Sequence, residues 1–151
     1  MKPDVPVVMG GFLAALATEI APNLGGEYSA GNASTMGLAL FFAGQEFERA
    51  AEIRVRENTE MRELFADAQA SDVVADEALR ARLREASKGT DESLAISALD
   101  QSNAELKTLL IDMQVALEAS TTTSAAQLED KVWNHLVGSA ERRKLVLPPT
   151  A

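Results

Sequence analysis

A long stretch without helix breakers constrains the fold of this 151-residue chain most strongly. Residues 32–69 contain no proline and no cluster of turn-forming residues, and Asn32 or Ser34 can cap the start of a helix there. A helix of that length measures about 55 Å, which is more than a compact domain of this size needs. We therefore expect a long second helix that kinks at Gly37 or Gly44, protrudes, or packs against a second subunit.

Four further helices are expected, one before the long stretch and three after it. Pro22 and the Gly25-Gly26 pair end the first helix, Gly89 ends the third, and residues 120–124 form a linker. Abundant Ala and Leu, scarce β-branched runs and only 5% aromatic residues favour helix over sheet. The predicted ranges are 5–21 with Asp4 as cap, 76–88, and 91–119 with Thr90 or Asp91 as cap. The capping-box spacing of Ser124 and Gln127 opens the last helix, and Arg142, Arg143 and Lys144 suit its C-terminus. The sequence thus predicts an all-α bundle of about five helices in one domain, residues 1–151, with an extended tail at residues 145–151.

Charge and missing motifs narrow the function classes. The formal net charge of −9, with 23 acidic and 14 basic residues, argues against nucleic-acid binding. Without cysteine there is no thiolate chemistry, and one histidine cannot supply the ligands of a di-iron bundle. Neither a phosphate-binding glycine loop nor a Gly-x-Ser-x-Gly motif occurs. The sequence predicts no catalytic residue, metal or cofactor, and it favours a protein that is not an enzyme.

The apolar run at residues 5–17 allows two interpretations. Its Ala15-Leu16-Ala17 ending imitates the cleavage site of a secretory signal, but Asp4, Pro6 and the Gly10-Gly11 pair do not fit one. The run is also shorter than the roughly 20 residues that span a membrane. We expect a buried first helix in a cytoplasmic protein that does not enter a membrane.

Two polar residues lie in the apolar stripe of the long helix. At 100° per residue, Leu40, Ala43, Ala51, Met61 and Phe65 share the face of Phe47, and most of the charge at residues 41–58 faces water. Arg54 and Asn58 fall inside this stripe. Because a buried arginine stays charged, we expect Arg54 to pair with Asp91, Glu92, Asp100, an acid of another subunit or an anionic ligand.

Other helices also carry a polar residue among apolar ones. These residues are Glu19, Ser102, Asn103 and His135. One interpretation is structural, since such side chains usually bond within the core. The other is a ligand site in which Arg54 binds an anion and Asn58, Asn103 and His135 orient it, with Glu19 as a further candidate. Glu19 should lie too far from Arg54 to contact it within one chain. A catalytic acid–base pair of His135 with Glu19 or Asp100 is a further alternative that the sequence allows.

Second apolar faces predict an interface. Phe42, Ile53 and Leu64 form a second line on the long helix, and Trp133 and Val137 form one on the last helix. Such faces cover another helix or another subunit. We expect a soluble binding or accessory module that forms a homodimer through these residues. The alternative is a small-molecule (anion) binding protein or an enzyme with a polar site between helices around Arg54.

One resemblance bears on the partner. The order Phe12-Leu13, Glu19, Pro22, Leu24, Gly26 and Asn32, followed by SALDQSNAELKTLLI at residues 97–111, resembles small bacterial all-helical proteins of unknown function. The resemblance touches about two thirds of the chain. Genes of such families often accompany an aminoglycoside-phosphotransferase-like protein or an acyl-CoA dehydrogenase. The resemblance therefore implies an accessory role with a phosphotransferase-like protein as one possible partner class, and it names no catalytic residue.

Overall fold

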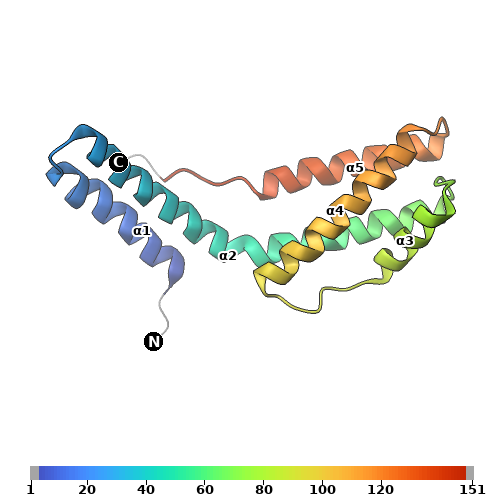
Figure 1. The fold of residues 1–151 in the computed structure, drawn as a ribbon, viewed down its shortest axis with the longest axis horizontal. Coiled ribbons are helices and arrows are strands. Elements are labelled where there is room, and N and C mark those ends of the chain that lie inside the picture. The colour runs from blue at the N-terminus through green and yellow to red at the C-terminus, as the bar shows by residue number, and fades with distance from the viewer. Residues whose placement is uncertain (1–3, 149–151) are drawn as a thin grey trace. The chain divides into compact units, whose positions relative to one another are not determined.

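A computed structural model describes residues 4–148 of the chain, and this part is all α-helical (Figure 1). No strand occurs among those residues, so the predicted all-α class with one long second helix is confirmed. The elements are α1 (Val5–Ala15), the π-helical turn η1 (Leu16–Ile20), the 3₁₀ turn η2 (Ala21–Asn23), α2 (Glu27–Ala70), α3 (Glu77–Lys88), α4 (Ile96–Glu118) and α5 (Thr123–Arg142). Of the predicted tail, residues 145–148 have no helix, and residues 149–151 lie outside the described part.

Side-chain caps fix the start of several helices. The carboxylate of Asp4 accepts from the backbone N–H of Val7 at 3.4 Å, as predicted, and that of Asp76 accepts from Ala78 at 2.8 Å. The cap of α5 is Thr122, which accepts from Ala125 at 3.2 Å, so the predicted cap at Ser124 is wrong by two residues.

Two predicted helix starts are also wrong. α2 begins at Glu27, before the predicted caps, because the Ser34 and Thr35 hydroxyls bond to carbonyls four residues back and let the helix continue. α4 begins at Ile96, since the carboxylate of Asp91 forms tertiary contacts instead of capping the helix.

The chain divides into two compact units. Unit 1 comprises Met1–Ala50 and Lys144–Ala151, described here at residues 4–50 and 144–148, and unit 2 comprises Ala51–Arg143. The helix α2 supplies residues to both. Two compact units can still fold together as one domain, so the predicted single domain stays a prediction.

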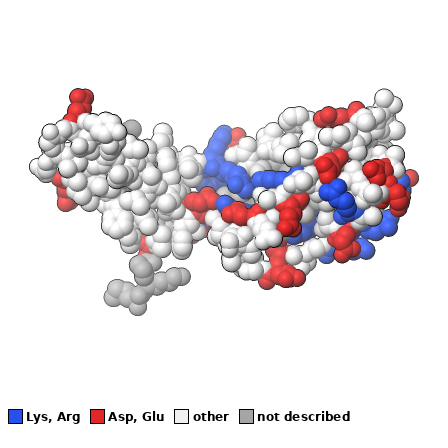
Figure 2. All heavy atoms as spheres, viewed as in Figure 1, with Lys and Arg blue, Asp and Glu red and all other residues white. Residues whose placement is uncertain are grey.

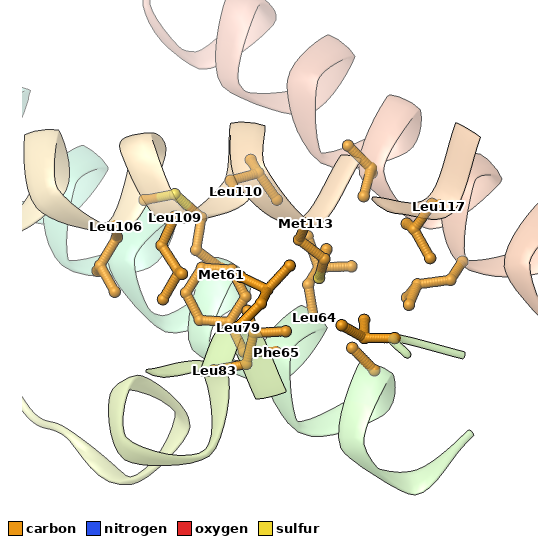
Figure 3. Packing of buried hydrophobic residues seen from close by; sticks show 14 of the residues in the cluster. Met61, Leu64, Phe65, Leu79, Leu83, Leu106, Leu109, Leu110, Met113 and Leu117 are labelled. Atoms are coloured by element: carbon orange, nitrogen blue, oxygen red, sulfur yellow. The ribbon is translucent and has the colours of Figure 1, made fainter. Parts of the chain in front are cut away.

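Unit 2 has a well-packed apolar core, and Figure 3 shows side chains of α2, α3 and α4 meeting in it. Its members on each helix recur at spacings of three, four or seven residues, as an amphipathic helix requires. On α4 the 100° spacing predicts a stripe of Ala95, Leu99, Leu106, Leu109, Leu110, Met113 and Leu117; all are buried except Ala95, which precedes the helix as its N-cap and is exposed. The core comprises Met61, Leu64, Phe65, Ala68, Val74, Leu79, Leu83, Leu106, Leu109, Leu110, Met113, Leu117, Ala125, Leu128 and Val132.

The predicted faces of α2 hold only in part. Met61 and Phe65 are buried as expected, but Phe47, which was placed in the same stripe, is 63% exposed. Ile53 and Leu64 are buried inside unit 2, so their assignment to an exposed interface is wrong. For Leu64 the reason is that it belongs to the core to which α3, α4 and α5 also contribute, so helices of the same chain cover more than one face of α2 in unit 2.

In unit 1, α1 packs antiparallel to the first half of α2 through two glycines. A Cβ atom at Gly44 would lie 3.0 Å from the Met9 Cβ, and one at Gly37 would lie 3.2 Å from the Leu13 Cα. The two backbones approach closely because no side chain intervenes at these positions. The glycines expected to kink α2 are therefore contact points in an uninterrupted helix.

The first helix is exposed, which corrects the prediction that it is buried. No residue of α1 is buried, and Val7 and Phe12 are 69% and 48% exposed. With η1 and η2 the helical segment extends to Asn23, because Pro22 sits in a 3₁₀ turn instead of ending the helix. The resulting 19 residues, Val5–Asn23, have the length and composition of a membrane span, which the shorter apolar run at residues 5–17 does not reach. Signal sequences share these properties.

The core of unit 2 predicts the effect of two matched substitutions. Leu117→Ala removes a fully buried side chain and should lower the free energy of unfolding by about 2–5 kcal/mol. Leu94→Ala, at a side chain that is mostly exposed, should change it by less than about 0.5 kcal/mol. Denaturant unfolding followed by circular dichroism measures both, and equal losses would contradict the described core.

Candidate functional site

The most buried ionisable group of unit 2 is the Glu57 carboxylate on α2, whose residue is 0% exposed. The Arg143 guanidinium donates from Nε to Oε1 at 2.8 Å and from Nη2 to Oε2 at 2.7 Å. The Ser139 hydroxyl donates to Oε1 at 2.6 Å, and the Lys107 ammonium lies 3.7 Å from Oε2. Arg143, at the end of α5, thus forms a bidentate ion pair with Glu57, which is the strongest arrangement of an arginine and a carboxylate.

These partners keep Glu57 ionised. Burial by itself would raise the pKa of its carboxyl, but the hydrogen bonds from Arg143 and Ser139 and the charges of Arg143 and Lys107 outweigh it. The pKa falls to about 2. A carboxylate with so low a pKa is a poor general base near neutral pH.

Two buried asparagines extend these contacts toward the start of α4. The Asn103 amide donates to Glu57 Oε2 at 3.2 Å and to Asn58 Oδ1 at 2.9 Å. The Asn58 amide donates in turn to Asp91 Oδ1 at 3.1 Å. Both asparagines therefore have partners for their buried polar atoms, as stability requires.

Asp91 ends this chain of contacts beside a second arginine. Its Oδ1 accepts from Arg62 Nη2 at 2.8 Å and from the Ser102 hydroxyl at 3.1 Å. Burial would raise the pKa of the Asp91 carboxyl, but hydrogen bonds from Arg62, Asn58 and Ser102 and the charge of Arg62 lower it. We call the connected set the buried polar network; it comprises Glu57, Asn58, Arg62, Asp91, Ser102, Asn103, Lys107, Ser139 and Arg143.

A separate cluster surrounds Glu60. Its Oε2 lies 2.9 Å from His135 Nδ1 and accepts from Arg142 at 2.5 Å, and its Oε1 accepts from Arg56 Nε at 3.0 Å. Burial would raise the pKa of Glu60, but hydrogen bonds from His135, Arg56 and Arg142 and the charge of Arg142 lower it. We assign the proton of a neutral His135 to Nδ1, because Glu60 is an acceptor and the buried Nε2 has no hydrogen-bond partner among the described residues.

The Glu60 cluster lines a hollow of about 400 Å³ between α2 and α5. Its charged residues pair with one another: Arg56 and Arg142 contact Glu60, and the Lys131 ammonium lies 2.6 Å from Asp67. The cations therefore offer little net attraction to an anion. This hollow does not have the electrostatics of an anion site.

The structure brings together only some of the predicted site residues. Asn58 and Asn103 bond to each other. Arg54 is buried and pairs with Asp100, with Nε 2.5 Å from Oδ1, which was one of the partners expected from the sequence. His135 belongs to the Glu60 cluster. Glu19 lies in unit 1 and is exposed.

Sequence reasoning missed the centre of the network, Glu57, and its partner Arg143. A signal for Glu57 was present, because Arg54, Glu57, Asn58 and Met61 have the spacing of residues on one helix face. Arg142, Arg143 and Lys144 suit the C-terminus of a helix by their charge alone, and this local role gives no sign that Arg143 contacts a glutamate 86 residues away.

Comparisons with known proteins found no match among protein-family models, curated proteins or solved structures. The resemblance to small bacterial helical proteins thus stays a prediction. Within residues 4–148 no group of three or more His, Asp or Glu side chains is arranged to hold a metal ion.

The network predicts the effect of removing one charge. Glu57→Gln keeps the side-chain volume but turns an amide donor toward the donors of Arg143, so the free energy of unfolding should fall by about 2–4 kcal/mol. Glu52→Gln, at an exposed position of the same helix, should change it by less than about 0.5 kcal/mol. Denaturant unfolding at neutral pH compares the two, and a stable Glu57→Gln protein would rule out a structural role for this carboxylate.

The lowered pKa values predict a loss of stability in acid. Glu57 has a pKa of about 2 when folded and about 4.5 ordinarily, so below pH 5 the unfolded chain binds more protons than the folded one. The stabilisation from Glu57 should be complete above about pH 5 and disappear as the pH falls toward 2. Urea midpoints measured from pH 7 to pH 2 test this; the Glu57→Gln protein should show a shallower decline, and parallel curves would contradict the assignment.

Proposed function

We propose that this chain is a binding or accessory module that acts as a homodimer and has no catalytic activity of its own. The observation that carries the proposal is the contrast between charged groups of unit 2 that mostly pair with one another and large apolar side chains left exposed on the helices. Groups held by internal hydrogen bonds and ion pairs have little capacity left for substrate, whereas exposed apolar faces are suited to protein contacts.

The face of α5 that carries Trp133 and Val137 supports docking of a protein partner. These side chains lie one helical turn apart and are 58% and 60% exposed, while Val132 on the same helix is buried in the core. Tryptophan contributes strongly to interfaces because it offers a large, rigid contact area. The resemblance noted above makes a phosphotransferase-like protein a candidate partner.

The charges support a protein partner over a nucleic acid. Basic and acidic side chains are interleaved on the visible surface of unit 2, without a continuous basic stripe (Figure 2). With a net charge of −9, the chain would be repelled by a phosphate backbone. The proposal places the protein in the cytoplasm.

The alternative, an anion site or active site around Arg54, has less support. The ion pair with Asp100 already compensates the charge of Arg54, and Asn58 and Asn103 bond to each other and to acidic neighbours. An anionic ligand would have to displace these contacts, which burial makes unfavourable.

The proposal predicts a dimer in solution without bound small molecules. Sedimentation equilibrium at micromolar concentration should give twice the 16.1 kDa of one chain, and native mass spectrometry should give no added mass. A monomer at these concentrations would contradict the homodimer. A retained anion that is lost in Arg54→Leu, with the fold intact, would favour the alternative instead.

A further inference from the structure

Unit 1 holds an unusually apolar pair of helices. Between residues 5 and 45 the only charged side chains are Glu19 and Glu27, and there is no basic residue. Figure 2 shows few charged side chains on the visible surface of α1 and the first half of α2, which is nearly all white. The rest of the chain carries nearly all of its charge.

Within one chain, this pair of helices leaves much of its apolar surface exposed. Contact through Gly37 and Gly44 uses only one side of each helix. On α1, its continuation and α2, the large apolar side chains that remain exposed in unit 1 are Val7, Val8, Phe12, Ile20, Leu24, Tyr28, Met36 and Phe47. The C-terminal segment of the same unit adds Leu145, Val146 and Leu147. Helices gain most of their stability from packing an apolar face, so two helices with this much exposed surface need a further layer.

We propose that the missing layer is the same pair of helices from a second copy of this chain. Two α1–α2 hairpins would then form an intersubunit four-helix bundle, in which each copy covers the exposed apolar side of the other. The inference rests on the proposed homodimer and names its surface. The α5 face with Trp133 and Val137 is left free for a different protein.

The surface available in unit 1 suits a dimer contact. The exposed apolar side chains of unit 1 lie on both α1 and α2, so a second copy seated on them would remove apolar surface of both helices from water. With only two charges in residues 5–45, two copies of this acidic chain can approach here with little repulsion. A self-complementary contact also needs no second protein.

A lipid bilayer fits the same surface less well. α1 with its continuation is the only segment among the described residues with the length and composition of a membrane span, and α2 has none. The first half of α2 presents Ser29, Asn32 and Gln45, and Glu19 would place a carboxylate within the span. Polar and charged groups are unfavourable in hydrocarbon.

The experiment compares charge substitutions on α1 with a matched change on α5. Phe12→Glu should raise the dimer dissociation constant at least about 100-fold, because each interface would then bury two carboxylates. Val7→Glu, at a second exposed site, should act in the same direction. Trp133→Glu on α5 should leave the dissociation constant unchanged. Sedimentation equilibrium measures all of these, and circular dichroism confirms that helix content is retained.

The possible results separate this inference from the proposed function. Loss of the dimer in Phe12→Glu and Val7→Glu, but not in Trp133→Glu, supports the α1 surface. Loss only in Trp133→Glu overturns this inference and keeps the homodimer. A wild-type protein that is monomeric overturns both. If that monomer also floats with phosphatidylcholine vesicles, while Phe12→Glu does not, the surface binds lipid instead.

Discussion

The rest of unit 2 depends on the ionised, fully buried carboxylate of Glu57. A charge without water must be compensated completely, so α4 has to present Asn103 and α5 has to present Ser139 and Arg143 at fixed positions. An apolar core alone tolerates small slips of one helix along another, because its contacts are not directional. The directional hydrogen bonds to Glu57 do not tolerate such slips, and they therefore specify one alignment of α2, α4 and α5.

Because the charges of unit 2 compensate one another, most of its charged side chains stabilise the fold and are not left to bind a ligand. In unit 2 the acidic side chains that could bind a cation, and the basic ones that could bind an anion, largely neutralise each other. Large apolar side chains stay exposed on two parts of the chain, namely Trp133 and Val137 on α5 and the helices of unit 1. These are the surfaces on which the proposed protein contacts would form.

Periodicity predicted the buried residues where neighbours surround a helix and failed where they do not. On α4 the predicted apolar positions within the helix, Leu99 to Leu117, are buried because core side chains of three other helices meet them, whereas Ala95, just before the helix, is exposed. On α1 the apolar residues with the same kind of spacing are not buried. On α2, Phe47 is exposed whereas Ile53 is buried. An apolar stripe shows which face of a helix prefers contact, but it does not show whether the same chain supplies that contact.

The sequence by itself determined the all-α class, the long second helix and the cap at Asp4. It also determined that Arg54 needs an acidic partner and that Asp100 is one of the few candidates for it. These features depend on propensities and contacts within a few residues, or on the rule that a buried charge must be compensated. Only the tertiary structure decided that Glu57 is the centre of the polar groups, that Arg143 holds it, and that α1 is exposed. Those outcomes depend on side chains that are 46 and 86 residues apart in the chain, and local patterns contain no record of which distant residues will meet.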